Sequence, residues 1–163
     1  MRETAGIQEK SLARGFPFRK VPTSQAATAM NITTFYKTEV ANAILGASTY
    51  SKSGSVYVAL HTADPTAAGN VGELTIGTSA YARVAVTNDG TGFPAASAGV
   101  KSNGAAVTFP TATGSWGAVT HFSIKDAATG GNTLFYGSLS ASKTVASGDT
   151  ISIPAGQLVL TIA

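Results

Sequence analysis

The chain has 163 residues, about one domain, and a core of that size can hold a fold without metal or disulfide. The sequence contains no cysteine, which excludes disulfide frameworks, thiol nucleophiles and thiolate metal sites. Only 12% of the residues are charged and 18 are glycine, a composition typical of short strands and tight turns rather than of long surface helices.

Residues 1–29 differ in character from the rest of the chain. They show no helical or strand period, and they carry the whole net charge of +3, with five cations and two carboxylates. Residues 30–163 hold six charges of each sign and are electrically balanced. We therefore predict an extended or disordered basic arm, residues 1–29, ahead of a folded domain, residues 30–163.

One part of this arm combines two aromatic side chains with two cations on a backbone stiffened by proline: Phe16, Phe18, Arg19 and Lys20. This composition suits a segment that lies in a groove of another protein, so these four are the predicted partner-binding residues. The alternative is that residues 1–29 are an upstream extension without a function, ahead of a start at Met30.

A helical period follows the arm. Apolar residues recur at steps of three and four in residues 31–47, which predicts one short amphipathic helix. Asn31 or Thr33 can cap its start, and Gly46 can end it. We expect this helix to pack on the rest of the domain or to close one end of it.

The remainder reads as short strands in which apolar and polar residues alternate. The expected strands are residues 55–62, 80–87, 105–109, 118–125, 133–139, 143–146, 150–153 and 157–162. Turn residues separate them, and the two longer connections, residues 63–79 and 88–104, are where a crossing between sheets or a partner contact is expected. This pattern predicts an all-β fold, an antiparallel β-sandwich or jelly roll.

A central hairpin is the clearest element. In residues 118–125, Phe122 and Ile124 fall on one face, and His121, Ser123 and Lys125 fall on the other. The connection to the next strand, residues 126–132, holds two glycines and is typical of a hairpin turn. The aromatic residues in and beside these strands are expected in the core rather than on an exposed stacking platform: Phe109, Trp116, Phe122, Phe135 and Tyr136.

Candidate catalytic and metal-binding residues are few. His61 with Asp64 could form part of a metal or acid–base site, but a strand histidine beside an Asp-Pro turn explains the pattern as well. A glycosidase pair such as Glu73 and Asp126 would have to meet across a cleft that the pattern does not indicate. We therefore expect no enzyme activity, no metal and no cofactor.

Other function classes receive little support. No apolar run reaches the roughly 20 residues of a membrane helix, and the N-terminus lacks the apolar segment of a signal peptide, so a soluble protein without a membrane contact is expected. The cations after the arm are scattered singly, which argues against specific nucleic acid binding.

Six segments carry a resemblance to a known family: residues 60–65, 81–84, 120–124, 126–132, 148–150 and 153–156. Together they resemble a family of small tailed-bacteriophage virion proteins, whose members are described as capsid decoration (cement) proteins or tail-fibre-like proteins. The resemblance covers about residues 54–163 and does not extend to residues 1–29. The family offers no catalytic residues to carry over.

The resemblance implies a structural protein of the virion. Our first interpretation is a capsid decoration protein, made in the host cytoplasm, that binds the capsid exterior and stabilises the shell by mass action. Its expected partners are the major capsid protein and neighbouring copies of itself in a homo-oligomer. The alternatives are a tail-fibre or adhesion module and, from another class, a carbohydrate-binding or hydrolytic β-sandwich.

Overall fold

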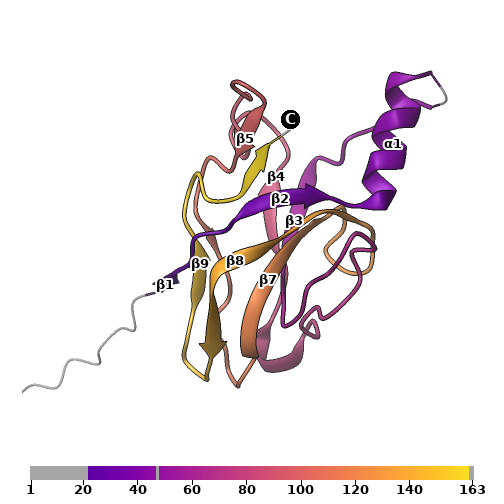
Figure 1. Cartoon of the computed structure of the whole chain (residues 1–163). Helices are drawn as coiled ribbons and strands as arrows, with labels where there is room; N and C mark the ends of the chain where they lie inside the picture. Colours follow the sequence, from indigo (N-terminus) through magenta and orange to yellow (C-terminus); the bar gives the residue numbers. More distant parts are fainter. Residues whose placement is uncertain (1–21, 47, 162–163) are drawn as a thin grey trace, which may run out of the picture.

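A computed structural model describes residues 22–46 and 48–161. Figure 1 shows these residues as two curled layers of strands with one helix at an end of the molecule. The elements are β1 (Thr23–Ser24), β2 (Ala29–Ile32), α1 (Thr34–Ile44), β3 (Ser55–His61), a 3₁₀ turn (Thr78–Ala80), β4 (Val84–Thr87), β5 (Val100–Ser102), β6 (Val107–Thr108), β7 (Gly117–Lys125), β8 (Thr133–Val145), β9 (Ile151–Ile153) and β10 (Val159–Thr161).

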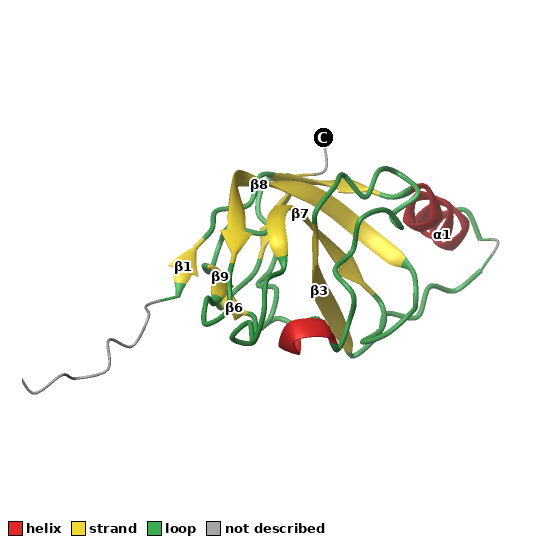
Figure 2. Ribbon diagram, turned by 90° about the horizontal axis from the view of Figure 1, so that it is seen from below, coloured by secondary structure: helices red, strands yellow, loops and turns green. Residues whose placement is uncertain are grey.

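The strands form a sandwich of two unequal sheets. The larger sheet has the order β4-β3-β7-β8-β2-β10-β5, and the smaller sheet has the order β1-β9-β6. Figure 2 shows the smaller sheet packed against the curl of the larger one. Phe122 of β7 and Ile151 of β9 belong to the same buried cluster, so both sheets supply the core. The predicted all-β sandwich class is confirmed.

The predicted antiparallel arrangement is wrong for two strand pairs. β1 pairs with β9 in parallel, and β2 pairs with β10 in parallel. In each case the first residues of the described chain pair with its last strands, and such a long connection places no constraint on direction. Alternation of apolar residues fixes which face of a strand is buried, but it does not fix the direction of the partner strand.

The central hairpin forms as expected. β7 and β8 pair antiparallel from Lys125 and Thr133 at the turn to Gly117 and Val145 at the far end. The turn contains Gly130 and Gly131 with φ of 60° and 68°, conformations that glycine adopts without strain. β8 continues through residues 143–145 of the separately predicted strand 143–146, because residues 140–142 are small and exposed and hide the continuation of the strand.

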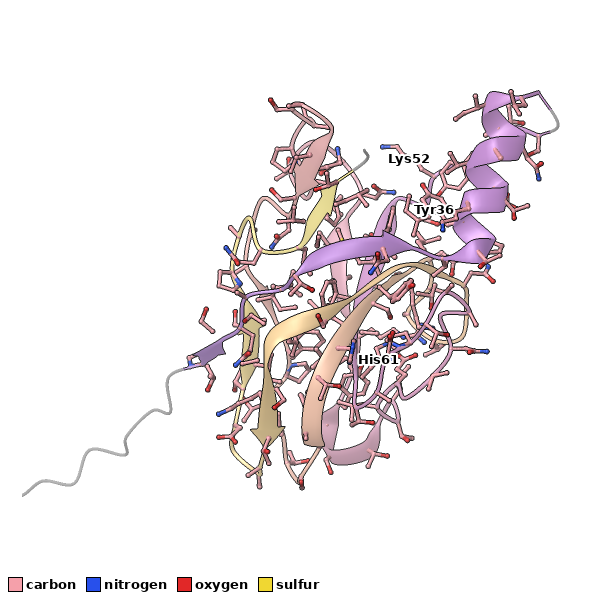
Figure 3. The ribbon with its side chains drawn as sticks, in the orientation of Figure 1. Tyr36, Lys52 and His61 are labelled. Carbon is pink, nitrogen blue, oxygen red and sulfur yellow. The ribbon has the colours of Figure 1, made fainter. Side chains whose placement is uncertain are left out.

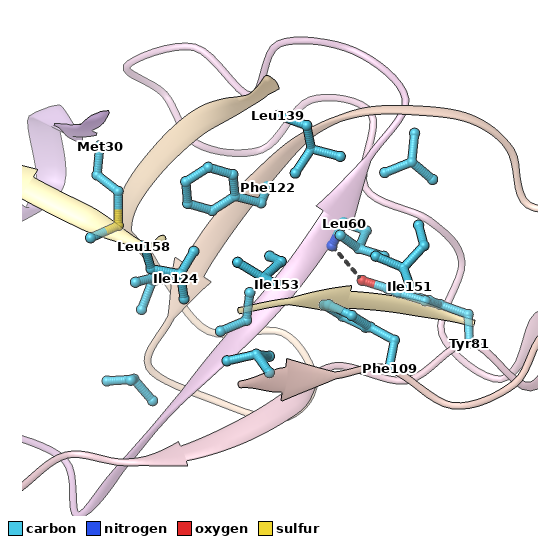
Figure 4. Close-up of a cluster of buried hydrophobic side chains, with 14 of the residues drawn as sticks. Met30, Leu60, Tyr81, Phe109, Phe122, Ile124, Leu139, Ile151, Ile153 and Leu158 are labelled. Atoms are coloured by element: carbon cyan, nitrogen blue, oxygen red, sulfur yellow. Dashed lines mark hydrogen bonds between the residues drawn. The ribbon is translucent and has the colours of Figure 1, made fainter. Parts of the chain in front are cut away.

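The core contains the side chains that alternation placed there. Val56, Val58 and Leu60 of β3 are buried, as are Phe122 and Ile124 of β7. Figure 4 shows Leu60 of β3 with Phe122 and Ile124 of β7 in one cluster with Ile151 and Ile153 of the smaller sheet. Of the predicted aromatic core residues, three are buried and two are half-buried: Phe109, Trp116 and Phe122, then Phe135 and Tyr136.

The predicted strand 80–87 is shorter than expected, because β4 begins only at Val84. Tyr81 is buried in the core instead, and its hydroxyl oxygen accepts a hydrogen bond from the Leu60 backbone N–H at 2.9 Å (Figure 4). The side chain thus satisfies a backbone group of β3 that a longer β4 would have paired. Tertiary packing of one aromatic side chain overrides the strand pattern here.

Regular pairing begins before the predicted domain boundary at Met30. Thr23 and Ser24 pair with Ile151 and Ser152, and Thr28 N–H donates to the Ser138 carbonyl at 2.9 Å. Residues 22–29, which the sequence analysis assigned to the arm, therefore run along the sandwich. The four predicted partner-binding residues, Phe16, Phe18, Arg19 and Lys20, lie outside the described residues.

The helix is shorter than the predicted residues 31–47. It spans Thr34–Ile44, and Thr33 is its N-cap, with the Thr33 side chain accepting from Tyr36 N–H at 3.3 Å. The two residues before the cap belong to β2 and pair with β8. No helix residue is fully buried: Tyr36 packs edge-on against Phe135, whereas Phe35 and Ile44 are exposed. The helix therefore stands out from one end of the sandwich (Figure 1).

Candidate functional site

Two features of the described residues stand out from an ordinary sandwich: a buried polar cluster beside β3 and an apolar groove beside α1. The cluster contains His61, Glu73, Arg83, Ser123 and Lys125. It lies over the face of β3 and β7 opposite to the one that carries Phe122 and Ile124. Residues 63–79, called here the covering loop, shield that face from solvent.

The covering loop is tied to the end of β3 by backbone hydrogen bonds. Thr62 N–H donates to the Gly72 carbonyl at 2.8 Å, and Leu74 N–H donates to the Leu60 carbonyl at 3.1 Å. The loop also reaches the first residue of α1, since Thr34 N–H donates to the Ala67 carbonyl at 3.0 Å. Residues 63–79, predicted as a long connection between strands, are thus packed onto the sheet and bury the polar side chains beneath them.

His61 lies at the centre of the cluster and is fully buried. Its Nδ1 is 2.7 Å from the Val71 carbonyl oxygen, which can only accept, so Nδ1 carries the proton. Its Nε2 is 2.8 Å from Ser123 Oγ and accepts from that hydroxyl. Burial lowers the pKa of His61 and outweighs the opposing effects of the Val71 carbonyl and of Glu73.

Glu73 and Arg83 form a two-pronged ion pair. Arg83 Nε and Nη2 donate to the two carboxylate oxygens of Glu73 at 2.6 and 2.9 Å, and Lys125 Nζ is 3.4 Å from Oε2. Burial alone would raise the pKa of Glu73, but the hydrogen bonds and charge of Arg83, with the charge of Lys125, more than offset it. The pKa of Glu73 therefore lies below its ordinary value.

Arg83 also joins the covering loop to the central hairpin. Its Nη1 donates to the carbonyls of Ala127 and Gly130 in the β7–β8 turn at 2.6 and 2.8 Å. A single side chain with 4% exposure thus connects Glu73 of the covering loop, the start of β4 and the hairpin turn. This geometry fits a structural clamp that holds two loops in one position.

The two residue pairs that were considered and set aside for catalysis or metal binding, His61 with Asp64 and Glu73 with Asp126, do not form. Asp64 Oδ1 accepts from Thr66 N–H within its own turn, and the partners of His61 are Val71 and Ser123. Asp126 accepts from the backbone and side chain of Asn132, so it does not meet Glu73 in a shared site. Across residues 22–46 and 48–161, no three His, Cys, Asp or Glu side chains gather as metal ligands would.

The sequence does not indicate the Ser123–His61 contact, because alternation shows only that Ser123 lies opposite to Phe122 and Ile124 on its strand. The two side chains have the spacing of a nucleophile and its base. Both are fully buried beneath the covering loop, however, so a substrate would reach Ser123 only after that loop had moved. The hydrogen bond between Ser123 and His61 gives each of these two buried polar side chains a partner.

The second feature is an apolar groove of about 540 Å³ at the end of the sandwich beside α1. Tyr36 and Val40 of α1 form one wall, and the buried side chains of Met30, Ile124 and Leu134 reach its floor. Figure 3 shows Tyr36 at this end and His61 well away from it, so the groove and the polar cluster are separate. No signal in the sequence brought these residues together, because they come from strands far apart in the chain.

Two lysines supply the charge at the rim of the groove. Lys52 Nζ donates to the Asn88 carbonyl at 2.9 Å, and Lys101 Nζ donates to the Pro94 carbonyl at 3.1 Å. Each ammonium keeps further N–H donors for another partner. No Asp or Glu is among the described residues that line the groove. The surface is therefore an apolar hollow with a positive rim.

The part of the chain that the structure describes contains no helix that is long and apolar enough to cross a membrane. In a comparison with protein families, residues 31–161 match the model described as Podophage GP4 fiber I protein gp80. No curated protein matches the chain. The family match covers the helix and nearly all of the sandwich, and it leaves out residues 1–30.

Proposed function

The chain belongs to the family of the podophage GP4 fiber I protein gp80 and is a bacteriophage structural protein, and from this premise we propose that it is a β-sandwich module of a tail fibre. The observation that carries this proposal is the family match over residues 31–161, whose description names a fibre. The proposed place of the module within the virion is therefore the tail, and its proposed partners are neighbouring copies of itself and other fibre subunits.

The structure gives physical reasons why the module suits a load-bearing particle. The Arg83 clamp and the hydrogen bonds of His61 fix the covering loop to the sheet, so that a connection of 17 residues behaves as part of the rigid body. The apolar groove and the exposed end of α1 offer surfaces that another subunit can cover. Rigid loops and uncovered apolar surface are both expected of a protein that works by assembly.

Capsid decoration is the second candidate, supported by the sequence resemblance described above. In that role the chain would bind the major capsid protein on the capsid exterior. The fold and the groove serve decoration as well as a fibre, since both functions need a stable sandwich and an apolar docking surface. The two candidates differ in copy number and in position on the particle.

A carbohydrate-binding role has less support. Sugar-binding sandwiches use exposed aromatic rings with hydrogen-bonding groups around them. Here Trp116 is buried, and its Nε1–H donates to the Ser79 carbonyl at 2.9 Å. We also propose that the chain is not an enzyme, because the His61–Ser123 pair is enclosed by the covering loop. The carboxylates considered for catalysis are used elsewhere, Asp64 and Asp126 in turns and Glu73 in an ion pair.

The copy number of the chain relative to the major capsid protein tests this proposal. Quantitative mass spectrometry of purified particles, with isotope-labelled peptides from both proteins as standards, gives the ratio. A fibre module is expected at a small ratio that matches the number of fibres on one tail. A ratio that matches the number of capsid capsomers would overturn the fibre assignment and favour decoration.

A further inference from the structure

Exposed apolar side chains gather at the end of the molecule that carries α1 and β5. They are Phe35, Ile44, Leu45, Tyr50 and Val100. Ile44 and Leu45, called here the α1 tip, are 75% and 84% exposed, although side chains of this size are normally covered. The groove lies between α1 and β5, since both elements line it. An apolar projection and an apolar hollow thus lie side by side on one chain.

The groove has room for apolar side chains. A cavity of about 150 Å³ is enough for a benzene ring, and the groove of about 540 Å³ is several times larger. Its floor reaches side chains of the hydrophobic core, so filling it would remove them further from water. An occupant that brings two or more aliphatic side chains would gain the usual hydrophobic free energy.

The charge at the rim selects among possible occupants. Lys52 and Lys101 stand at the rim, and no carboxylate is among the described residues that line the groove. Asp89, outside the groove, feels the charge of Lys52, so Lys101 is the less compensated of the two cations. Residues 1–21 of this chain bring five cations and two carboxylates, so their charge does not complement the rim. An occupant with a negative end fits better.

The α1 tip has that negative end. The last four carbonyls of a helix point beyond its C-terminus and carry a partial negative charge. The last turn of α1 contains no basic residue that would balance this charge. Two of these carbonyls accept within the chain, Ala41 from the C-cap Leu45 N–H and Asn42 from Ser48 N–H. The α1 tip is therefore an apolar end with partial negative charge, and the groove is an apolar hollow with positive charge at its rim.

A tip cannot enter the groove of its own chain. Tyr36 and Val40 in the middle of α1 already form a wall of that groove, and the helix continues past them away from the sandwich (Figures 1 and 3). We propose that the α1 tip of one copy docks in the apolar groove of a neighbouring copy, with the Lys52 and Lys101 ammonium groups against the carbonyls at the end of the incoming helix. The contact is head-to-tail, so copies assemble into a closed ring or continue as a filament.

This interface rests on surface chemistry alone and holds for a fibre or a decoration protein alike. If the test of this interface fails, the proposed fibre function is unaffected, because the copy number of the chain on the particle is measured independently. The occupant is a second copy of this chain. A small apolar molecule in the groove is the competing outcome.

The test is the association state of the full chain and of variants, measured by sedimentation velocity over a wide range of concentration. The wild type is expected to associate. Leu45→Lys removes an exposed apolar side chain and brings a third cation toward the rim, whereas in the free chain a lysine at a helix C-terminus is favourable. We expect an unchanged melting temperature and association weaker by ~10-fold or more. Lys101→Glu is expected to act in the same way from the groove side.

Two matched controls separate the interface from general surface effects. Ile76→Lys places the same type of change in the covering loop, and Lys143→Glu reverses a charge on β8. Both are expected to associate like the wild type. A mixture of the Leu45→Lys and Lys101→Glu chains restores one intact contact, because the first keeps a normal groove and the second a normal tip. The mixture is expected to form a complex that neither chain forms alone.

Several results would overturn the proposal. They are a wild type that stays monomeric at every concentration, variants that associate as the wild type does, and a mixture of the two variants that gives no complex. Native mass spectrometry that finds a small apolar molecule bound to monomeric chains would also overturn it, and it would assign the groove to that ligand.

Discussion

His61 and Ser123 are diagonal neighbours across the β3–β7 ladder. His61 Nε2 lies 2.8 Å from Ser123 Oγ, and both side chains are fully buried. The pair explains why the covering loop keeps its position. His61 uses its other nitrogen to hold the Val71 carbonyl of that loop at 2.7 Å. Ser123 thus helps to hold a loop that it does not contact through a hydrogen bond of its own.

Ser123→Ala is expected to destabilise the domain by about 1–3 kcal/mol, because it leaves the buried Nε2 of His61 without a donor. Urea unfolding followed by fluorescence measures the change. The control is Ser140→Ala, which removes an exposed hydroxyl in the middle of β8 and should cost little. Equal midpoints for the two variants would show that the His61–Ser123 bond contributes nothing to stability.

Stability is expected to decrease in mild acid because of His61. Burial holds its pKa below the ordinary value, so the unfolded chain binds a proton at a pH where the folded chain does not. The contribution of neutral His61 is complete above the unfolded pKa of about 6.5 and is lost progressively as the pH falls below it. His61→Gln should flatten this slope between pH 7 and 5 relative to the wild type. The free energy of unfolding from urea titrations at several pH values measures both slopes.

A second loss of stability is expected at lower pH. The pKa of Glu73 lies below its ordinary value, so its ion pair with Arg83 stabilises the fold above the unfolded pKa of about 4.3. That contribution is lost as the pH falls further, through the folded pKa. The two groups therefore act in separate pH windows, and Glu73→Gln should remove only the lower one.

Arg83→Met is expected to cost about 3–5 kcal/mol, since it leaves the Glu73 carboxylate with Lys125 alone and frees two carbonyls of the hairpin turn. The double variant Arg83→Met with Glu73→Leu should recover part of the loss, because no buried charge remains unpaired. Hydrogen exchange should become faster in both the covering loop and residues 126–132. Faster exchange in only one of them would contradict the clamp.

Gly137→Ala tests the packing of the central hairpin. A methyl group at residue 137 would stand 2.9 Å from Phe122 Cζ and 3.2 Å from the Ala29 carbonyl oxygen, so we expect destabilisation by roughly 1–3 kcal/mol. Shortening the opposing ring with Phe122→Leu should make the added methyl less costly. A thermal unfolding cycle of the two single variants and the double variant measures this coupling, and additive changes would show that Phe122 does not limit the space.

The predicted contact residues of the arm, Phe16, Phe18, Arg19 and Lys20, call for a deletion that stops at residue 21. A longer deletion would also remove Thr23 and Ser24, which pair with β9. We expect deletion of residues 1–21 to leave the melting temperature nearly unchanged and to weaken attachment to particles, most clearly at low salt. Full attachment of the shortened chain at every salt concentration would favour an upstream extension without a function.

The sequence predicts which face of each strand is apolar, but it does not predict which segments cover the opposite face. Alternation placed Phe122 and Ile124 in the core correctly. It also placed His61 and Ser123 on the opposite side of the sheet, which is correct, but that side is buried by the covering loop rather than exposed. The covering loop has no hydrophobic periodicity, so its sequence does not indicate that it folds back along the end of β3. The partners of Arg83 were hidden for the same reason, since they come from two separate turns.

The end of the molecule beside α1 was the least predictable part. The apolar stripe of residues 31–47 suggested a helix packed along its length, whereas α1 leaves Ile44 exposed. Apolar residues at three- and four-residue spacing show that a helix has an apolar face. They do not show whether that face packs within the same chain or against another chain. The groove is formed by side chains from α1 and from β2, β3, β5, β7, β8 and β10, and no local pattern contains that arrangement.

The position of the chain on the phage particle tests the central claim most directly. Particles that carry an epitope tag on this chain can be labelled with gold-conjugated antibody and imaged by electron microscopy, with untagged particles as the control. The fibre assignment predicts gold at the tail and along its fibres, with none on the head above the level of the control. Gold spread over the head in a regular pattern would contradict it and would establish capsid decoration instead.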